Sequence, residues 1–186
     1  MKFFAIAALA VLLLASPANA ADWIIQPAQS QLGFSGTQTG APFKGSFAKW
    51  TGQITYDPAN PAAAHVKITV DTASAATGDT QRDGALPGAD WFNVTAFPQA
   101  VFEATGFVAK GGNNFVADGT LTIRGIAKKL SLPFTLTIAG KQATAIGQVI
   151  LLRTDYGVGQ GVWTTGDYVG LNVDVTFTLV ATQSGD

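Results

Sequence analysis

Two pairs of charged residues could perform chemistry in this 186-residue chain: Arg82 with Asp83, and Arg153 with Asp155. A carboxylate near an arginine can exchange a proton with a substrate, and the arginine can bind a polar head group. The chain contains no Gly-x-Ser-x-Gly elbow, phosphate-binding loop or dinucleotide fingerprint. The two pairs therefore indicate contacts at the rim of a binding site, with acid–base catalysis as the weaker interpretation.

Histidine and cysteine chemistry is nearly absent. The chain has no cysteine, which excludes disulfides, thiol catalysis and thiolate metal sites, and its one histidine is His65. By alternation, His65 lies on the polar side of a strand, opposite Val66, Ile68 and Val70, so we interpret it as solvent-exposed. No cluster of carboxylates indicates a metal. We predict neither a metal nor a cofactor.

The charge balance limits the classes of partner. Lys and Arg number 11 and Asp and Glu number 12, and charged residues make up only 12% of the chain. A nucleic-acid-binding protein would carry a basic excess, so no nucleic acid is expected as a partner.

The N-terminus has the pattern of a secretion signal. Lys2 precedes the apolar run 3–15, and residues 16–20 (Ser-Pro-Ala-Asn-Ala) provide a cleavage site of small residues. We therefore predict a signal peptide over 1–20, export to the periplasm, and one domain over 21–186. No later run is long and apolar enough to cross a membrane as a helix.

Apolar and polar residues alternate along most of the mature chain, which predicts half-buried antiparallel strands and an all-β fold. Eight or nine strands are expected, over 22–26, 31–36, 47–56, 64–71, 99–108, 115–124, 129–138, 143–152 and 171–180. Pro133 falls inside one of them, on its polar side. Because proline cannot donate a ladder hydrogen bond, that strand should have a free or bulged edge there.

Alternation alone does not separate a closed barrel from a two-sheet sandwich. The inward faces contain many small residues, namely Ala100, Ala104, Gly106, Ala117, Gly119, Ala143, Ala145 and Gly147. Small side chains on several strands leave room for a ligand inside an eight-stranded barrel, but they could equally relieve crowding at barrel corners.

The segment 72–95 interrupts the alternation. It predicts a long connection with a short helix around 79–86 and a further turn around 89–93. The adjacent aromatics Trp91 and Phe92 must find apolar surface, which suits either a lid over the mouth of a barrel or a plug at its bottom. Asp83 is expected either to cap this helix and pair on the surface or to reach the rim.

Arg153 falls, by alternation, on the cavity side at the end of its strand, where it would meet a polar head group, an acidic residue of the lid, or a partner in a rim salt bridge. Aromatic residues in or beside loops are the candidates for the mouth of the pocket: Trp91, Phe92, Phe97, Trp163 and Tyr168.

Short motifs follow one another along the chain: Trp23, Ser30-Gln31-Leu32-Gly33-Phe34, Gly45-Ser46-Phe47, Gly52-Gln53-Ile54-Thr55-Tyr56-Asp57, Arg82-Asp83, Trp91-Phe92, Phe97-Pro98-Gln99-Ala100-Val101-Phe102, Gly119-Thr120-Leu121-Thr122-Ile123-Arg124-Gly125 and Arg153-Thr154-Asp155-Tyr156-Gly157. In this order and spacing they resemble the YceI-like family over nearly the whole mature chain. The resemblance implies an extended eight-stranded antiparallel lipocalin-like barrel with a short helix or lid at one end. It also implies an apolar tunnel for a long isoprenoid or fatty chain.

With this resemblance, the main hypothesis is a non-enzymatic periplasmic carrier of a long-chain isoprenoid lipid, quinone-like or polyprenyl-like. Lipid contacts are predicted from Phe34, Val66, Ile68, Val70, Leu86, Trp91, Phe92, Phe97, Phe102, Leu132, Phe134, Leu136, Trp163 and Tyr168. The head-group or rim residues are predicted to be Arg82, Asp83, Arg153 and Asp155.

Two other hypotheses stand beside the carrier. One is a lipid-modifying enzyme that uses Asp83, Arg153 and Asp155 as acid and base groups. The other is a docking partner of a membrane b-type cytochrome, which the resemblance implies because some relatives occur beside such cytochromes. The apolar residues Ile146, Ile150 and Leu152 would suit a homodimer contact.

Overall fold

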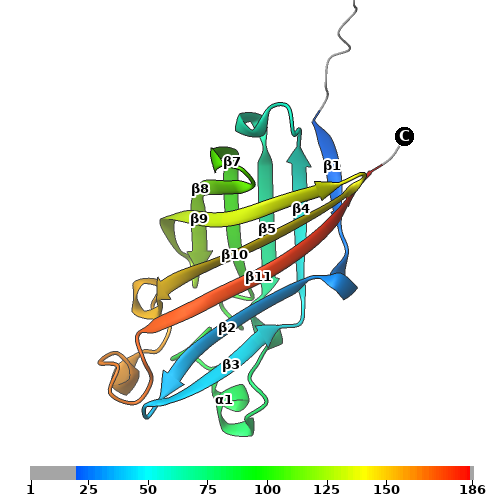
Figure 1. The fold of residues 1–186 in the computed structure, drawn as a ribbon. Coiled ribbons are helices and arrows are strands. Elements are labelled where there is room, and N and C mark those ends of the chain that lie inside the picture. The colour runs from blue at the N-terminus through cyan, green and yellow to red at the C-terminus, as the bar shows by residue number, and fades with distance from the viewer. Residues whose placement is uncertain (1–19, 185–186) are drawn as a thin grey trace, which may run out of the picture.

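The computed structural model describes residues 20–184, which form a strongly curved antiparallel sheet and one short α-helix (Figure 1). The signal peptide predicted over 1–20 lies outside the described residues except for Ala20. No helix in the described part has the length and hydropathy of a membrane span. The strands are β1 (Ala21–Ile25), β2 (Gln31–Gln38), β3 (Ala41–Phe47), β4 (Trp50–Tyr56), β5 (His65–Asp71), β6 (Ala75–Ala76), β7 (Gln99–Gly111), β8 (Asn114–Ile123), β9 (Ile126–Ala139), β10 (Gln142–Leu152) and β11 (Asn172–Gln183).

The helical elements are short. Helix α1 (Thr80–Ala85) lies within the predicted range 79–86, and five 3-10 helices connect the strands: η1 (Pro27–Gln29), η2 (Pro61–Ala63), η3 (Thr72–Ser74), η4 (Arg153–Tyr156) and η5 (Gly161–Trp163).

Eight strands close into a ring, in the order β1-β4-β5-β7-β8-β9-β10-β11, and β11 returns to pair with β1. The predicted eight-stranded antiparallel barrel is therefore confirmed. Strands β2, β3 and β6 form a branch of the sheet. Residues 181–183 of β11 pair with β1, whereas residues 174–178 of β11 pair with β2. The chain passes from one pairing to the other through η1.

The strand predicted over 47–56 is wrong at its beginning. Phe47 ends β3, β4 begins at Trp50, and β3 itself is missing from the predicted set. Gly45 hides the alternation of β3, since it stands where an apolar residue would be expected. A Cβ at Gly45 would lie 2.3 Å from the ring of Phe34, so a neighbouring aromatic fills the space of the missing side chain.

Pro133 has the free edge that the sequence predicted. The ladder between β9 and β10 runs from Ala139 opposite Gln142 to Phe134 opposite Gly147, and it stops there. Beyond this point the two strands diverge (Figure 1), so the missing N–H of Pro133 costs no ladder hydrogen bond.

Some of the small inward residues leave room in the cavity, and others relieve crowding between strands, so both sequence-based interpretations hold. Four of the predicted small residues line the cavity described below: Ala100, Ala117, Ala143 and Ala145. Gly119 and Gly147 relieve crowding instead, since a Cβ there would lie 2.8 Å from the ring of Phe102 and 2.4 Å from that of Phe177, respectively.

The inward position predicted for Gly106 is wrong. The register of β7 against β8 shifts between Ala104 and Phe107, so Phe107 faces the interior instead of Gly106. Gly106 has a φ of +81°, and a Cβ there would lie 2.8 Å from the carbonyl oxygen of Ala62. A β-bulge of this kind reverses the facing of the residues that follow it.

Candidate functional site

A cavity of about 650 Å³ runs through the barrel and lies within the size range of small-molecule pockets. At one end it reaches Trp23 and Tyr56, which belong to a buried core cluster with Ala64, Ala143 and Ala181. The indole N–H of Trp23 donates to the carbonyl of Tyr56 at 3.1 Å. At the opposite end of β4 and β5, the cavity reaches α1 and the loops that follow it.

Most of the predicted contact residues line this cavity. They are Phe34, Val66, Ile68, Val70, Leu86, Trp91, Phe92, Phe102, Leu132, Phe134, Leu136 and Trp163, together with the arginines Arg82 and Arg153. The strand residues among them come from β2, β5, β7 and β9. Every strand except β6 contributes to the continuous, largely apolar wall. Its area and shape suit a long apolar ligand.

Four predicted site residues lie outside the cavity wall. Phe97 packs against Gly125, and Tyr168 is 56% exposed and contacts the ring of Trp163. The carboxylates of Asp83 and Asp155 are likewise absent from the wall.

The wall also contains residues that were not among the predicted contacts, including Trp23, Gln38, Phe43, Trp50, Tyr56, Thr77, Gln81, Phe107 and Tyr156. The spacing of Phe43 and Phe47, four residues apart, could have identified β3, the middle strand of the branch. Phe107 was hidden by the bulge in β7. Burial raises the pKa of Tyr56 and of Tyr156, and a nearby carboxylate adds to each rise, so both phenols are neutral hydroxyl groups at neutral pH.

Helix α1 covers the end of the cavity opposite Trp23. Asp79 is its N-cap and accepts hydrogen bonds from the backbone N–H groups of Gln81 at 3.1 Å and Arg82 at 3.0 Å. The segment that follows contributes Leu86, Trp91 and Phe92 to the wall. The connection over 72–95 therefore covers one end of the barrel, while strand side chains fill the other.

Two loops that are distant in sequence close this end together. The carbonyl of Asp90 accepts from the backbone N–H groups of Gly159 at 2.7 Å and Gln160 at 2.8 Å. Arg124 donates to the carbonyls of Ala89 and Trp91 from the turn between β8 and β9. The loop after α1 is thereby fixed to the loop after η4.

Arg153 is the centre of this closure, and backbone carbonyls surround its guanidinium instead of the acidic side chain that the sequence suggested. The residue is 4% exposed, and its guanidinium donates only to backbone carbonyls among the described residues: Val158 at 2.9 Å, Gly159, Trp163, Val169 at 2.7 Å and Gly170 at 2.9 Å. We call Arg153 and these five carbonyls the Arg153 clasp.

The clasp uses every N–H that an arginine has, because Nε carries one and the two Nη atoms carry four. The guanidinium also lies over the ring of Trp91, 5.4 Å from its centroid. Burial lowers the pKa of Arg153 from its ordinary value. The residue acts on the loop between β10 and β11 and has no donor left for a ligand.

Asp155 lies apart from Arg153 although the two residues are neighbours in the sequence. Its carboxylate forms a salt bridge with Lys128, with 3.1 Å between Oδ1 and Nζ, and both side chains are nearly half exposed. This pair joins η4 to the start of β9 outside the cavity wall, so Asp155 is not the acidic partner of Arg153.

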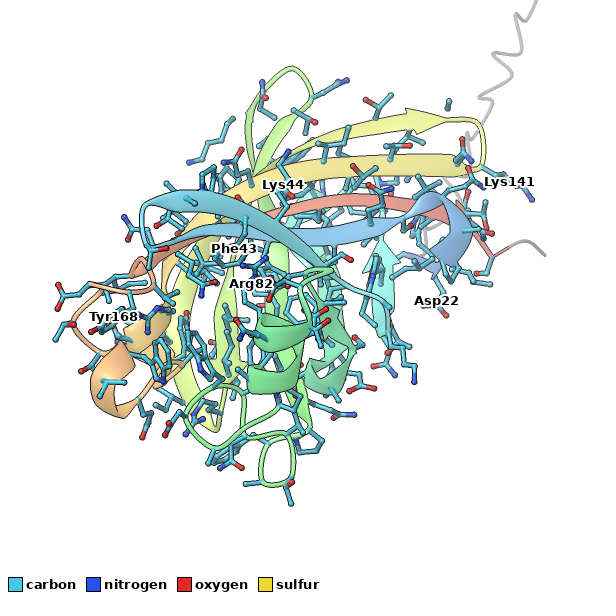
Figure 2. All side chains as sticks on the ribbon, turned by 90° about the horizontal axis from the view of Figure 1, so that it is seen from below. Asp22, Phe43, Lys44, Arg82, Lys141 and Tyr168 are labelled. Atoms are coloured by element: carbon cyan, nitrogen blue, oxygen red, sulfur yellow. The ribbon has the colours of Figure 1, made fainter. Side chains whose placement is uncertain are left out.

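Arg82 reaches the cavity from α1, with its guanidinium over the ring of Phe43 in β3 at 4.9 Å from the centroid; Figure 2 shows the two residues close together beneath the sheet. Its Nε donates to the Thr77 hydroxyl at 3.2 Å, and its Nη1 donates to Oε1 of Gln38 at 2.9 Å. Asp83 fixes the Thr77 hydroxyl that accepts from Arg82, because the Asp83 carboxylate accepts hydrogen bonds from the backbone N–H and the hydroxyl of Thr77.

Acid–base chemistry has little support in this geometry. The carboxylate of Asp83 accepts three hydrogen bonds from Thr77 and Gly78, and the Thr77 hydroxyl is the main reason that the pKa of Asp83 is lowered. His65 lies near Glu103, at 3.7 Å, where both side chains are more than 40% exposed. Within residues 20–184, no three His, Asp or Glu side chains gather as they would around a metal.

Comparison with known proteins gives a consistent assignment. The family model of the YceI-like domain matches residues 23–181. A UPF0312 protein of Shewanella baltica is 30% identical over 175 residues, which is 89% of this chain and 92% of the relative. A UPF0312 protein of Vibrio cholerae is 31% identical over the same shares of the two chains.

Solved structures share the fold. BcnA of Burkholderia cenocepacia superposes with a TM-score of 0.82 and 33% identity, over 85% of this chain and 99% of BcnA. A polyisoprenoid-binding domain from Saccharophagus degradans has a TM-score of 0.73 and 17% identity, over 89% of this chain and 99% of that domain. The matched span, the identities and the shared barrel together show that this chain belongs to the YceI-like family.

Proposed function

We propose that this protein is a periplasmic carrier of a long-chain isoprenoid lipid, with a quinone-like head group as the favoured cargo. The observation that carries the proposal is the continuous apolar cavity that runs from Trp23 and Tyr56 to α1. The polyisoprenoid-binding domain of Saccharophagus degradans, which has the same fold, supports an isoprenoid as the ligand.

The energetics suit such a tail. Burial of each methylene-sized unit contributes about 0.8 kcal/mol, so ten units would contribute several kcal/mol after the cost of ordering the chain. No charged group is needed along the wall, and apart from the arginines at the α1 end the described wall has none. A carrier therefore requires nothing that this cavity lacks.

The cargo is tested by purifying the protein from periplasm without detergent and analysing an organic extract by mass spectrometry. A stoichiometric isoprenoid would establish the carrier function and identify the lipid. An empty, folded protein that also takes up no isoprenoid quinone would contradict it. Recovery of the protein, with residues 1–20 removed, in the periplasmic fraction would test the predicted export.

A matched pair of substitutions tests where the tail lies. Ala145 faces the cavity, so Ala145→Phe should fill part of it and reduce lipid occupancy by about tenfold. The next residue, Ile146, is 52% exposed, and Ile146→Phe should leave occupancy unchanged. Equal occupancy in both variants would place the lipid elsewhere.

Trp163→Ala tests the mouth of the cavity in the same way. Trp163 lines the wall and contacts Trp91 at 5.6 Å between ring centroids, so its removal should speed lipid loss. Its neighbour Val162 is 68% exposed and lies outside the wall, which makes Val162→Ala the control. Equal rates of lipid loss would exclude Trp163 from the binding site.

The homodimer and the cytochrome partner stay predictions. Ile146, Ile150 and Leu152 are 52%, 61% and 39% exposed on the outer face of β10. Ile150→Lys should abolish a dimer formed through this face, which sedimentation at equilibrium would detect. Co-purification of a membrane b-type cytochrome with the lipid-free protein would support docking.

A further inference from the structure

The polar side chains of the cavity wall gather at one place. Apart from Arg153 and the aromatic residues, the polar side chains in the described wall are Gln38, Thr77, Gln81 and Arg82. Gln38 comes from the end of β2, and the other three come from α1 and the turn before it. We call these four residues the α1 notch.

Arg82 is held so that part of its guanidinium is left for a ligand. Thr77 and Gln38 accept from Nε and Nη1, and Phe43 supports the flat face of the group. Among residues 20–184, Nη2 has no hydrogen-bond acceptor, because the closest carboxylate oxygen, Oδ2 of Asp79, is 3.8 Å away. The side chain of Arg82 is 27% exposed, so a bound ligand can reach these N–H groups.

The Arg153 clasp cannot take this role. All five of its N–H groups donate to backbone carbonyls, and its guanidinium lies against Trp91. A head group at this end of the cavity therefore finds its strongest free donor at Arg82.

The charges around Arg82 determine which head group it accepts. Asp79 lies 3.8 Å from Arg82, and Asp83 lies behind Thr77, so one positive charge is accompanied by two negative ones. A phosphate would be attracted by Arg82 and repelled by both carboxylates. An uncharged head group would still accept from Nη2 and from the side-chain amides of Gln38 and Gln81 without this repulsion.

We propose that the α1 notch recognises an uncharged lipid head group with acceptor oxygens, such as the carbonyl of a quinone, in preference to a phosphate. The inference rests on the proposed function, because it assumes that the tail lies in the cavity. It adds the end at which the head group lies, the residue that binds it, and the class of head group.

The test uses three lipids with isoprenoid tails of equal length: ubiquinone, a polyprenyl phosphate and a hydrocarbon without a head group. Wild-type protein should bind the quinone about tenfold more tightly than the phosphate, as measured by competition for quenching of tryptophan fluorescence. Arg82→Leu should weaken quinone binding about tenfold, the lower end of the range expected for one charge-assisted hydrogen bond. It should leave hydrocarbon binding unchanged.

Asp79→Asn is the matched variant, because asparagine is also a good N-cap and keeps the helix while removing one negative charge. It should raise phosphate affinity several-fold and change quinone affinity little. Tighter binding of the phosphate than of the quinone in wild type would overturn the inference. An Arg82→Leu variant that loses all three lipids equally would also overturn it, since the effect would then be on the tail or the fold.

These results separate the inference from the proposed function. If all three lipids bind with equal affinity, the carrier function stands and head-group recognition at the α1 notch is wrong. If a folded wild-type protein binds none of them, the carrier function fails and the inference fails with it.

Discussion

Arg153 and Arg82 line the same end of the cavity but differ in what surrounds them. Arg153 is 4% exposed and donates all its N–H groups to five backbone carbonyls of one loop. The side chain of Arg82 is 27% exposed and donates to two side-chain oxygens, and the described residues leave its Nη2 without an acceptor. Arg153 therefore holds the loop between β10 and β11 in place, whereas Arg82 keeps one nitrogen available for a ligand.

The difference has a physical basis. A buried guanidinium is costly unless each donor is satisfied, and backbone carbonyls satisfy it without adding a buried negative charge. A partly exposed guanidinium keeps its hydration, so one of its N–H groups can lack a protein acceptor at little cost to stability. Substitutions at the two arginines should therefore separate stability from binding.

The largest effect is expected from Arg153→Leu. Five carbonyls would lose their donor in a buried environment, so the free energy of unfolding should fall by roughly 3–5 kcal/mol. Urea denaturation followed by tryptophan fluorescence would measure it. Arg153→Lys should recover only part of the loss, because an ammonium has three N–H groups and no planar fork. A loss below about 1 kcal/mol would show that the clasp does not stabilise the fold.

Substitutions at two glycines of the same loop test how closely the backbone packs against Arg153. Gly159 has a φ of +83°, and a Cβ there would lie 2.0 Å from Nη1 of Arg153; Gly161 has a φ of +60° with no atom within 4 Å of its Cβ position. Gly159→Ala should cost about 2–3 kcal/mol and Gly161→Ala about 1 kcal/mol, which is the backbone strain alone. Equal losses in urea denaturation would mean that the clasp tolerates displacement.

Arg82→Leu should have a smaller effect on stability. It removes two partly exposed hydrogen bonds and a contact with Phe43, so the free energy of unfolding should change by less than about 1 kcal/mol. The same urea experiment measures this change. A loss as large as that of Arg153→Leu would mean that the two arginines share one structural role.

Most strands were predictable from the sequence because their residues alternate and their breaks have local causes, whereas the closure of the strands into a barrel was expected from the family resemblance. Pro133 marks the free edge of β9 through its own covalent structure, so the sequence contains that information. Gly45 and Gly106 misled the prediction because their roles depend on the ring of Phe34 and the carbonyl of Ala62, which are distant in the chain.

The cavity wall was mostly predictable, whereas the roles of the two arginines were not. Alternation correctly placed Arg153 on the inner face, but backbone carbonyls have no sequence signature, so its partners could not be read from residue types. Asp155 is close in sequence, yet η4 turns the chain and brings it to Lys128. Sequence patterns indicate which face a charge occupies, and only the tertiary fold determines whether its donors are free.

The smallest expected effect is a difference in pH dependence between the two regions. Hydrogen bonds from Thr77 lower the pKa of Asp83 below its ordinary value of 3.8. A lowered pKa in the folded protein means that the ionised carboxylate stabilises the fold above the ordinary pKa, and that this stabilisation is lost as the pH falls through the lowered value. The stability difference between wild type and Asp83→Asn should therefore be constant above about pH 5 and shrink below about pH 4.

Arg153 provides the comparison for this titration. Its guanidinium stays charged throughout the acidic range, so the stability difference between wild type and Arg153→Leu should not change between about pH 3 and pH 7. Urea midpoints measured for all three proteins across this range would decide the matter. If the Asp83→Asn difference were as independent of pH as the Arg153→Leu difference, the carboxylate of Asp83 would not be the group that holds Thr77 and, through it, Arg82.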